Sequence, residues 1–328
     1  MIHYTLYIIF FFFGLCVGSF LNAVIYRLEV GESIVLKLKR QGKGTKSLLK
    51  GLSPFGRLAR SHCPHCKATL KWHDLVPVLS FIFLRGKCRY CGEKISWQYP
   101  IVEIATGIIF LLISNFEFRI SNQILITEFL NGHWSLVIGY FLQLIYWLYI
   151  ASALIVIFVY DFKHYLIPDK VLFPAIVVSI MYHVLSIMYG QNYTLYIILH
   201  TLYSYLGSAL GASAFFLALV LATRGRGMGL GDVKLAFLMG LVLGWPNILV
   251  ALFLAFLLGS IVGLGLVLIS GISISGGPTS AGGRTSQNWN PNYSLKSQIP
   301  FGPFLIAGTF IALFWGSQIV GWYWGLLF

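Results

Sequence analysis

The sequence predicts an all-α, polytopic membrane protein with about eight transmembrane helices and one small cytosolic loop domain. Hydrophobic residues make up 58% of the 328 positions and charged residues only 10%, and the mean hydropathy is +0.81. An ordinary soluble domain carries about 25% charged residues. The apolar residues are also grouped into long stretches, which polar segments separate. This composition excludes a soluble globular protein.

The apolar stretches give the expected helices. A helix needs about 20 apolar residues to cross a hydrocarbon core of about 30 Å. The first stretch has no basic residues before it and no small-residue cleavage site after it, so we expect a retained helix rather than a signal peptide. The expected membrane stretches are residues 4–26, 100–115, 134–160, 166–189, 194–222, 233–246, 247–271 and 301–327.

Basic residues predict the orientation and the domain boundaries. Residues 27–100 contain 15 of the 23 Lys and Arg residues but only four acids. Loops rich in Lys and Arg stay in the cytoplasm, so residues 27–99 are expected to form a cytosolic loop domain after a first transmembrane helix at residues 1–26. Residues 100–328 then hold the other helices, with a flexible cytosolic loop at 272–299. Anionic lipid headgroups explain the net charge of +13 better than nucleic acid does.

Two CxxC pairs in the loop domain predict a structural zinc site. Their sequences are CPHC and CRYC, with 21 residues between them. Four thiolates around one tetrahedral ion give a small segment its fold and leave no open position for catalysis. A redox pair or a disulfide is the alternative, but the cytosolic placement and the absence of a βαβ pattern oppose it. The expected ligands are Cys63, Cys66, Cys88 and Cys91, with His62, His65 and His73 as nearby rivals.

Two of the ten acidic residues lie at expected cytosolic helix ends. Asp161 ends the helix at 134–160, and Asp232 begins the stretch at 233–246 within a glycine cluster. If the two carboxylates lie close together, one keeps a proton while the other stays charged, which supplies an acid and a base in one site. The alternative is helix capping or contact with neighbouring Lys and Arg side chains.

Three further features belong to the same region. The glycines before Asp232 permit unusual dihedral angles and a close approach of another backbone, while their spacing matches no phosphate-binding loop. Asp169, after Pro168, is suited to capping or stabilising a helix start. Glu103, in the second helix, is expected to make a buried polar contact or a substrate contact.

Five segments together resemble the bacterial type IV prepilin peptidases, membrane aspartyl proteases of the Gly-X-Gly-Asp class. The segments follow the family's order from the first helix to the last. They are GSFLNAVIYRL (18–28), CPHC with PVLSFIFLRGKCRYCGEKISWQYPIVE (77–103), DFKHYLIPD (161–169), GMGLGDVKL (227–235) and IPFGPFL (299–305).

The resemblance implies a function. Asp161 and Asp232 become the catalytic pair, and Asp169 does not. The implied substrates are type IV prepilins or pseudopilins, cut after a leader glycine at the cytosolic face of the bacterial inner membrane. Many members then methylate the new N-terminus with S-adenosylmethionine. No cofactor loop is visible in the sequence, so this second activity and its residues rest on the resemblance alone.

One departure from the family and two rival functions remain. Glu32 to Arg60 contains eight bases and one acid, a balance suited to anionic lipid rather than to a basic leader peptide. The closer rival is a peptidase without methyl transfer. The more distant one is a non-enzymatic transporter or scaffold, although transporters place their acidic residues near the middle of the membrane.

Overall fold

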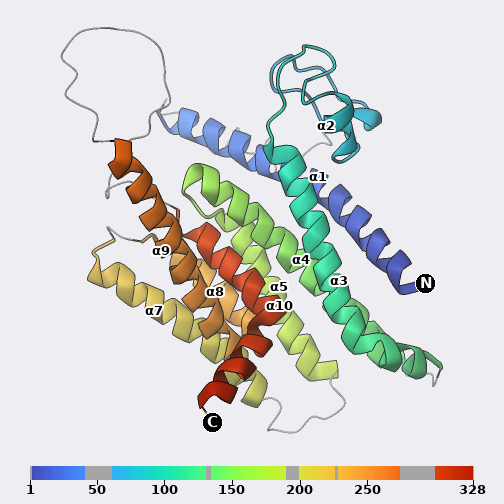
Figure 1. Ribbon diagram of the computed structural model, residues 1–328, viewed down its shortest axis with the longest axis vertical. Coiled ribbons are helices and arrows are strands. Elements are labelled where there is room, and N and C mark those ends of the chain that lie inside the picture. Colours follow the sequence, from blue (N-terminus) through green and yellow to red (C-terminus); the bar gives the residue numbers. More distant parts are fainter. Residues whose placement is uncertain are drawn as a thin grey trace. The chain divides into compact units, whose positions relative to one another are not determined.

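The computed structural model describes residues 2–40, 61–130, 134–189, 199–225, 228–273 and 300–327 (Figure 1). The described chain is helical, and its only β pairing consists of two isolated bridges in the loop region. It divides into two compact units, residues 1–160 with 173–191 and residues 161–172 with 192–328. The expected basic stretch at 37–60 and the expected loop at 272–299 lie almost entirely outside the described residues.

In the first unit, α1 (Ile2–Arg40) lies along α3 (Gln98–Leu130), as Figure 1 shows. Glycines allow the close crossing. A Cβ atom on Gly14 would lie 2.7 Å from the Cα atom of Gly107, and one on Gly18 would lie 2.7 Å from the Cα atom of Glu103. Small residues at such crossings let helix backbones touch inside a membrane.

Helices α4 (Trp134–His164) and α5 (Asp169–Tyr189) are joined in this unit by aromatic and polar contacts. The ring of Tyr146 stacks on that of Tyr182 with a centroid separation of 4.0 Å, and its hydroxyl donates to Ser179 Oγ at 3.3 Å. Ser179 in turn donates to the Ala175 carbonyl at 2.8 Å. These buried polar groups therefore satisfy one another between apolar helices.

The second unit contains a π-helical turn η3 (Leu202–Gly207) followed by α7 (Ser208–Ala222), then α8 (Leu230–Leu243), α9 (Asn247–Ser273) and α10 (Gly302–Leu327). Glycines again set the closest approaches. A Cβ atom on Gly240 of α8 would collide with the backbone of Ala209 in α7, and one on Gly308 of α10 would collide with the Ala251 carbonyl of α9.

Seven helices in the described part of the chain are long and apolar enough to cross a membrane. They confirm a polytopic, all-α membrane protein and match seven of the eight predicted stretches. Their bounds are Thr5–Gly31, Gln98–Asn115, Ile138–His164, Asp169–Ile187, Leu199–Ala222, Asn247–Leu266 and Gly302–Leu326.

The eighth predicted stretch, residues 233–246, corresponds to α8, which is shorter than the other seven helices. It has 14 residues and is therefore about 21 Å long, shorter than a membrane core. Leu235, Ala236, Leu238 and Met239 are fully buried in it. A helix that is apolar on every side lies in a protein core or in a membrane, and α8 packs inside the second unit between its neighbours.

Candidate active site and candidate metal centre

Asp161 lies one turn before the end of α4, with its side chain buried. Its backbone carbonyl accepts the N–H of Tyr165 at 2.8 Å, which closes the last turn of the helix. The N–H of Gly302, the first residue of α10, donates to the Asp161 carboxylate. The first turn of α10 therefore faces this carboxylate.

Asp232 occupies the first turn of α8 and closes that turn on itself. Its carboxylate accepts the N–H of Gly229 at 3.3 Å, while its own N–H donates to the Gly229 carbonyl at 3.2 Å. Gly231 next to it leaves room for the loop after α4, because a Cβ atom there would lie 3.3 Å from the side chain of Ile167. This neighbour is a side chain of the same chain, whereas the glycine cluster was expected to let another backbone approach.

The second unit brings Asp161 and Asp232 together although 71 positions separate them in the sequence. The negative charge of Asp232 acts on the Asp161 carboxyl. Asp161 is buried and Asp232 is half-buried. Two carboxyl groups close enough to interact titrate as a pair rather than singly.

Asp169 has a separate role. It is the first residue of α5, as expected for a residue that stabilises a helix start. Its two carboxylate oxygens accept hydrogen bonds from the Lys234 ammonium at 2.9 and 3.0 Å. Lys234 lies two positions after Asp232, so this exposed ion pair fastens the start of α5 to the first turns of α8.

The four cysteines of the loop region form one cluster. Their sulfur atoms all lie within 4.8 Å of one another, and those of Cys63 and Cys91 are 3.9 Å apart. Zinc–sulfur bonds of about 2.3 Å in a tetrahedral site place sulfurs about 3.8 Å apart. The cluster therefore fits a tetrahedral metal ion. It consists of the four sulfurs alone, without the histidines considered as rivals.

The two CxxC pairs sit in two turns of the same kind. The N–H of Lys67 donates to the Cys63 carbonyl at 2.9 Å, and the N–H of Gly92 donates to the Cys88 carbonyl at 2.9 Å. Both turns use positive φ angles at the residue after the second cysteine, +57° at Lys67 and +72° at Gly92. An isolated β-bridge flanks each turn, His62 with Thr69 and Lys87 with Lys94. Two equivalent turns thus present two thiols each to a common centre.

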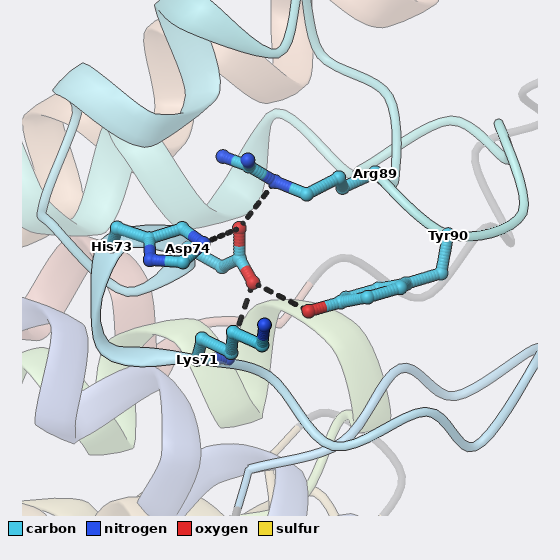
Figure 2. A network of polar contacts seen from close by, with 5 residues as sticks. All are labelled: Lys71, His73, Asp74, Arg89 and Tyr90. Atoms are coloured by element: carbon cyan, nitrogen blue, oxygen red, sulfur yellow. Dashed lines mark hydrogen bonds and ion pairs between the residues drawn. The ribbon is translucent and has the colours of Figure 1, made fainter.

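Figure 2 shows how the second turn is held. The carboxylate of Asp74 accepts hydrogen bonds from the backbone N–H of Lys71 at 3.1 Å and from the Tyr90 hydroxyl at 3.2 Å, and it forms an ion pair with the Arg89 Nε at 2.8 Å. His73 Nε2 lies 3.6 Å from the same carboxylate. Burial raises the pKa of Asp74, but these donors and positive charges outweigh it and leave the pKa below its usual value.

Arg89 and Tyr90 are the two residues between Cys88 and Cys91. Asp74 therefore holds the tip of the second cysteine turn from the η2 turn (Trp72–Asp74), which lies between the two CxxC pairs. Asp74 was not among the residues predicted from the sequence. The acidic position between two CxxC motifs was visible, but its partners are defined only by the folded loop.

Glu103 makes the buried polar contact that was expected of it. Its side chain accepts the backbone N–H of Val78 at 2.8 Å. Val78 precedes the short helix α2 (Leu79–Phe83) and has a φ of +59°, an unfavourable value for a β-branched residue. The contact joins the loop region to α3, and no local pattern predicted its partner.

Comparisons with known proteins match two regions of the chain. Residues 12–116 match the family described as the bacterial peptidase A24 N-terminal domain and include the cysteine cluster. Residues 148–264 match the type IV leader peptidase family and include Asp161 and Asp232. No solved structure matches the chain significantly.

Curated relatives cover nearly the whole chain. A protein of Aeromonas hydrophila is 29% identical over 95% of this chain and 92% of its own length, and one of Legionella pneumophila is 29% identical over 98% and 95%. A protein of Bacillus subtilis is 28% identical over 96% of both chains. All three are named prepilin leader peptidase/N-methyltransferase. With a carboxylate pair and a four-cysteine cluster inside the two matched regions, this multi-pass membrane protein belongs to the type IV leader peptidase family.

Proposed function

We propose that this chain is a membrane aspartic endopeptidase that removes the leader peptide of type IV prepilins or pseudopilins. The observation that carries the proposal is the pairing of Asp161 with Asp232 within one unit. Its relatives are named for this reaction. The site lies at helix ends, where an extended substrate segment leaving the membrane is accessible.

The carboxylate pair supplies both halves of peptide hydrolysis. The ionised member takes a proton from water as the water oxygen bonds to the scissile carbonyl carbon, and the protonated member donates a hydrogen bond to the carbonyl oxygen. When the C–N bond breaks, the carboxyl pair passes the proton that it took from water to the leaving amine. The backbone N–H groups of Gly302 and Gly229 hold the two carboxylates in place. The pair titrates as a unit, so neither role belongs to one residue.

The cysteine cluster is proposed to hold one structural zinc ion through Cys63, Cys66, Cys88 and Cys91. The sulfur separations and the two matching turns fit it. When bound, zinc cross-links the loop and supplies folding free energy. Four sulfurs leave no position for water, so the ion organises the loop and takes no part in hydrolysis.

The chain is also proposed to methylate the N-terminus that cleavage releases. The names of the relatives support this second activity and imply S-adenosylmethionine as the methyl donor. A peptidase without methyl transfer is the alternative. A transporter is disfavoured because the carboxylate pair lies at the ends of α4 and α8.

The proposed location is the bacterial inner membrane, with the cysteine loop and the carboxylate pair on the cytosolic side. The excess of Lys and Arg in residues 27–100 supports this orientation. The basic stretch at 37–60 is proposed to contact anionic lipid headgroups. Nucleic acid is not among the proposed partners.

Co-expression with a prepilin, followed by mass spectrometry of the pilin, tests both activities at once. We expect loss of the leader and addition of one methyl group to the new N-terminus. Mature pilin without the methyl group would show that the chain is a peptidase that does not methylate. An uncut prepilin beside a correctly inserted protein would refute the proposed function.

A further inference from the structure

The short helix α2 exposes large apolar side chains on one side. Leu79, Ile82 and Phe83 follow the i, i+3, i+4 spacing of one helix face. Their exposed fractions are 50, 61 and 80%, and Trp97, whose ring contacts Phe81 at 5.0 Å, is 71% exposed. Exposed apolar groups in this number, close together, mark a surface that contacts another phase or molecule.

Two contacts place this face at the start of a membrane span. Val78, the residue before α2, donates its N–H to Glu103 of α3 at 2.8 Å. Phe81 contacts Trp97, which directly precedes α3 and its candidate span from Gln98. Glu103 is five residues beyond Gln98, about 7.5 Å along the helix. The two headgroup layers of a bilayer together take up about 10–15 Å of its thickness. Each layer is therefore about as deep as the distance along the helix from Gln98 to Glu103.

The charges around α2 indicate what this exposed face contacts. Gly86 lies close to Phe81, because a Cβ atom placed on Gly86 would be 3.1 Å from the Phe81 ring. On either side of Gly86 are the exposed residues Arg85 and Lys87, and Lys87 pairs with exposed Lys94 through a β-bridge. Basic residues beside aromatic and aliphatic ones are the composition of a surface that lies on an anionic membrane.

We propose that α2 and Trp97 form an interfacial anchor. Leu79, Ile82, Phe83 and Trp97 enter the headgroup boundary of the bilayer that α3 crosses, and Lys87 and Lys94 contact anionic headgroups. The anchor holds the cysteine cluster at the membrane surface. A prepilin segment is the other apolar partner of interest, but a basic rim would repel a basic leader peptide.

Photo-crosslinking in nanodiscs tests the anchor. The full chain carries benzoylphenylalanine at position 83, or at position 93 as the control, because Glu93 is exposed on the second cysteine turn. The discs contain phosphatidylcholine and phosphatidylglycerol, and adducts are identified by mass spectrometry. We expect several-fold more phospholipid adduct at position 83 than at position 93. Equal yields at the two positions would overturn the proposal.

Two further experiments distinguish between the possible partners of this face. Adding excess prepilin peptide is expected to leave the lipid adducts at position 83 unchanged, and replacement of these adducts by peptide adducts would assign the face to substrate. In the position 83 chain, Lys87→Gln should lower the phosphatidylglycerol share of the adducts by about fivefold, the effect of one basic residue at an anionic surface. An unchanged share would remove the anionic lipid from the proposal.

Discussion

Gly302 and Asp161 are in such close contact that any side chain at position 302 would displace the Asp161 carboxylate. The Gly302 N–H donates to the Asp161 carboxylate, and a Cβ atom on Gly302 would collide with that carboxylate. The contact joins the end of α4 to the start of α10, which are 141 positions apart in the sequence.

Gly302→Ala is expected to reduce leader cleavage strongly because the methyl group displaces Asp161 from Asp232. Gly321→Ala is the matched control: it lies in the same helix, and a Cβ atom there meets nothing within 4 Å. Initial cleavage rates of a prepilin by purified, membrane-inserted variants measure the difference. Equal rates for the two variants would show that the Gly302 contact does not position the carboxylate.

Asp161→Asn and Asp232→Asn should each lower cleavage by about a hundredfold to ten-thousandfold, the usual contribution of general acid–base catalysis. An amide neither accepts nor supplies the required proton, while its size preserves the fold. Membrane insertion and zinc content should stay at wild-type values. Substantial activity in either variant would remove that residue from the mechanism.

Asp169→Asn should have a much milder effect. It loses an exposed ion pair with Lys234 and a helix-start interaction, each worth up to about 1 kcal/mol. We expect a slightly lower thermal midpoint and a cleavage rate within a few-fold of wild type. Lys234→Gln removes the other member of the same ion pair, so its thermal midpoint and cleavage rate should match those of Asp169→Asn. A loss as large as that of Asp232→Asn would place Asp169 in the reaction.

Replacing any one of Cys63, Cys66, Cys88 and Cys91 with Ser should lower the zinc content and loosen the loop. Cleavage should fall in part, and methyl transfer, if the loop houses it, should fall further. Zinc per protein and the ratio of methylated to unmethylated pilin measure this. Wild-type protein that is fully active in both steps without zinc would disprove the structural zinc, and a variant that lost only cleavage would assign the loop to proteolysis.

Asp74→Asn should destabilise the second cysteine turn by about 1–3 kcal/mol, because the turn loses its hydrogen bonds to a charged carboxylate. Tyr90→Phe, which removes one of its donors, should cost less. The measurement is the rate of zinc release to a chelator.

The pH dependence gives Asp74 a further check. Its pKa in the folded loop is lower than usual, so its stabilisation is complete above the unfolded pKa of about 4 and is lost as the pH falls through the folded pKa. The difference between wild type and Asp74→Asn should therefore be constant from about pH 6 to pH 8. A difference that changed across this range would show that another group dominates the network.

Local sequence patterns determined the membrane class, seven of the helices and the cysteine cluster. Hydropathy depends on composition over about 20 residues, and a CxxC turn needs only four. The same locality limits what hydropathy says of α8: it is as apolar as a membrane span, and hydropathy does not distinguish contact with lipid from contact with protein.

Tertiary structure alone decided which polar groups meet. Asp161 and Asp232 were singled out by their rarity and by a family resemblance, but only the packing of the second unit brings them into electrostatic contact and adds Gly302. Asp74 with Tyr90 and Glu103 with Val78 were likewise invisible. Each pairing depends on the relative position of two segments. That position is set by close packing at glycines and by the cysteine cluster, and no local pattern records it.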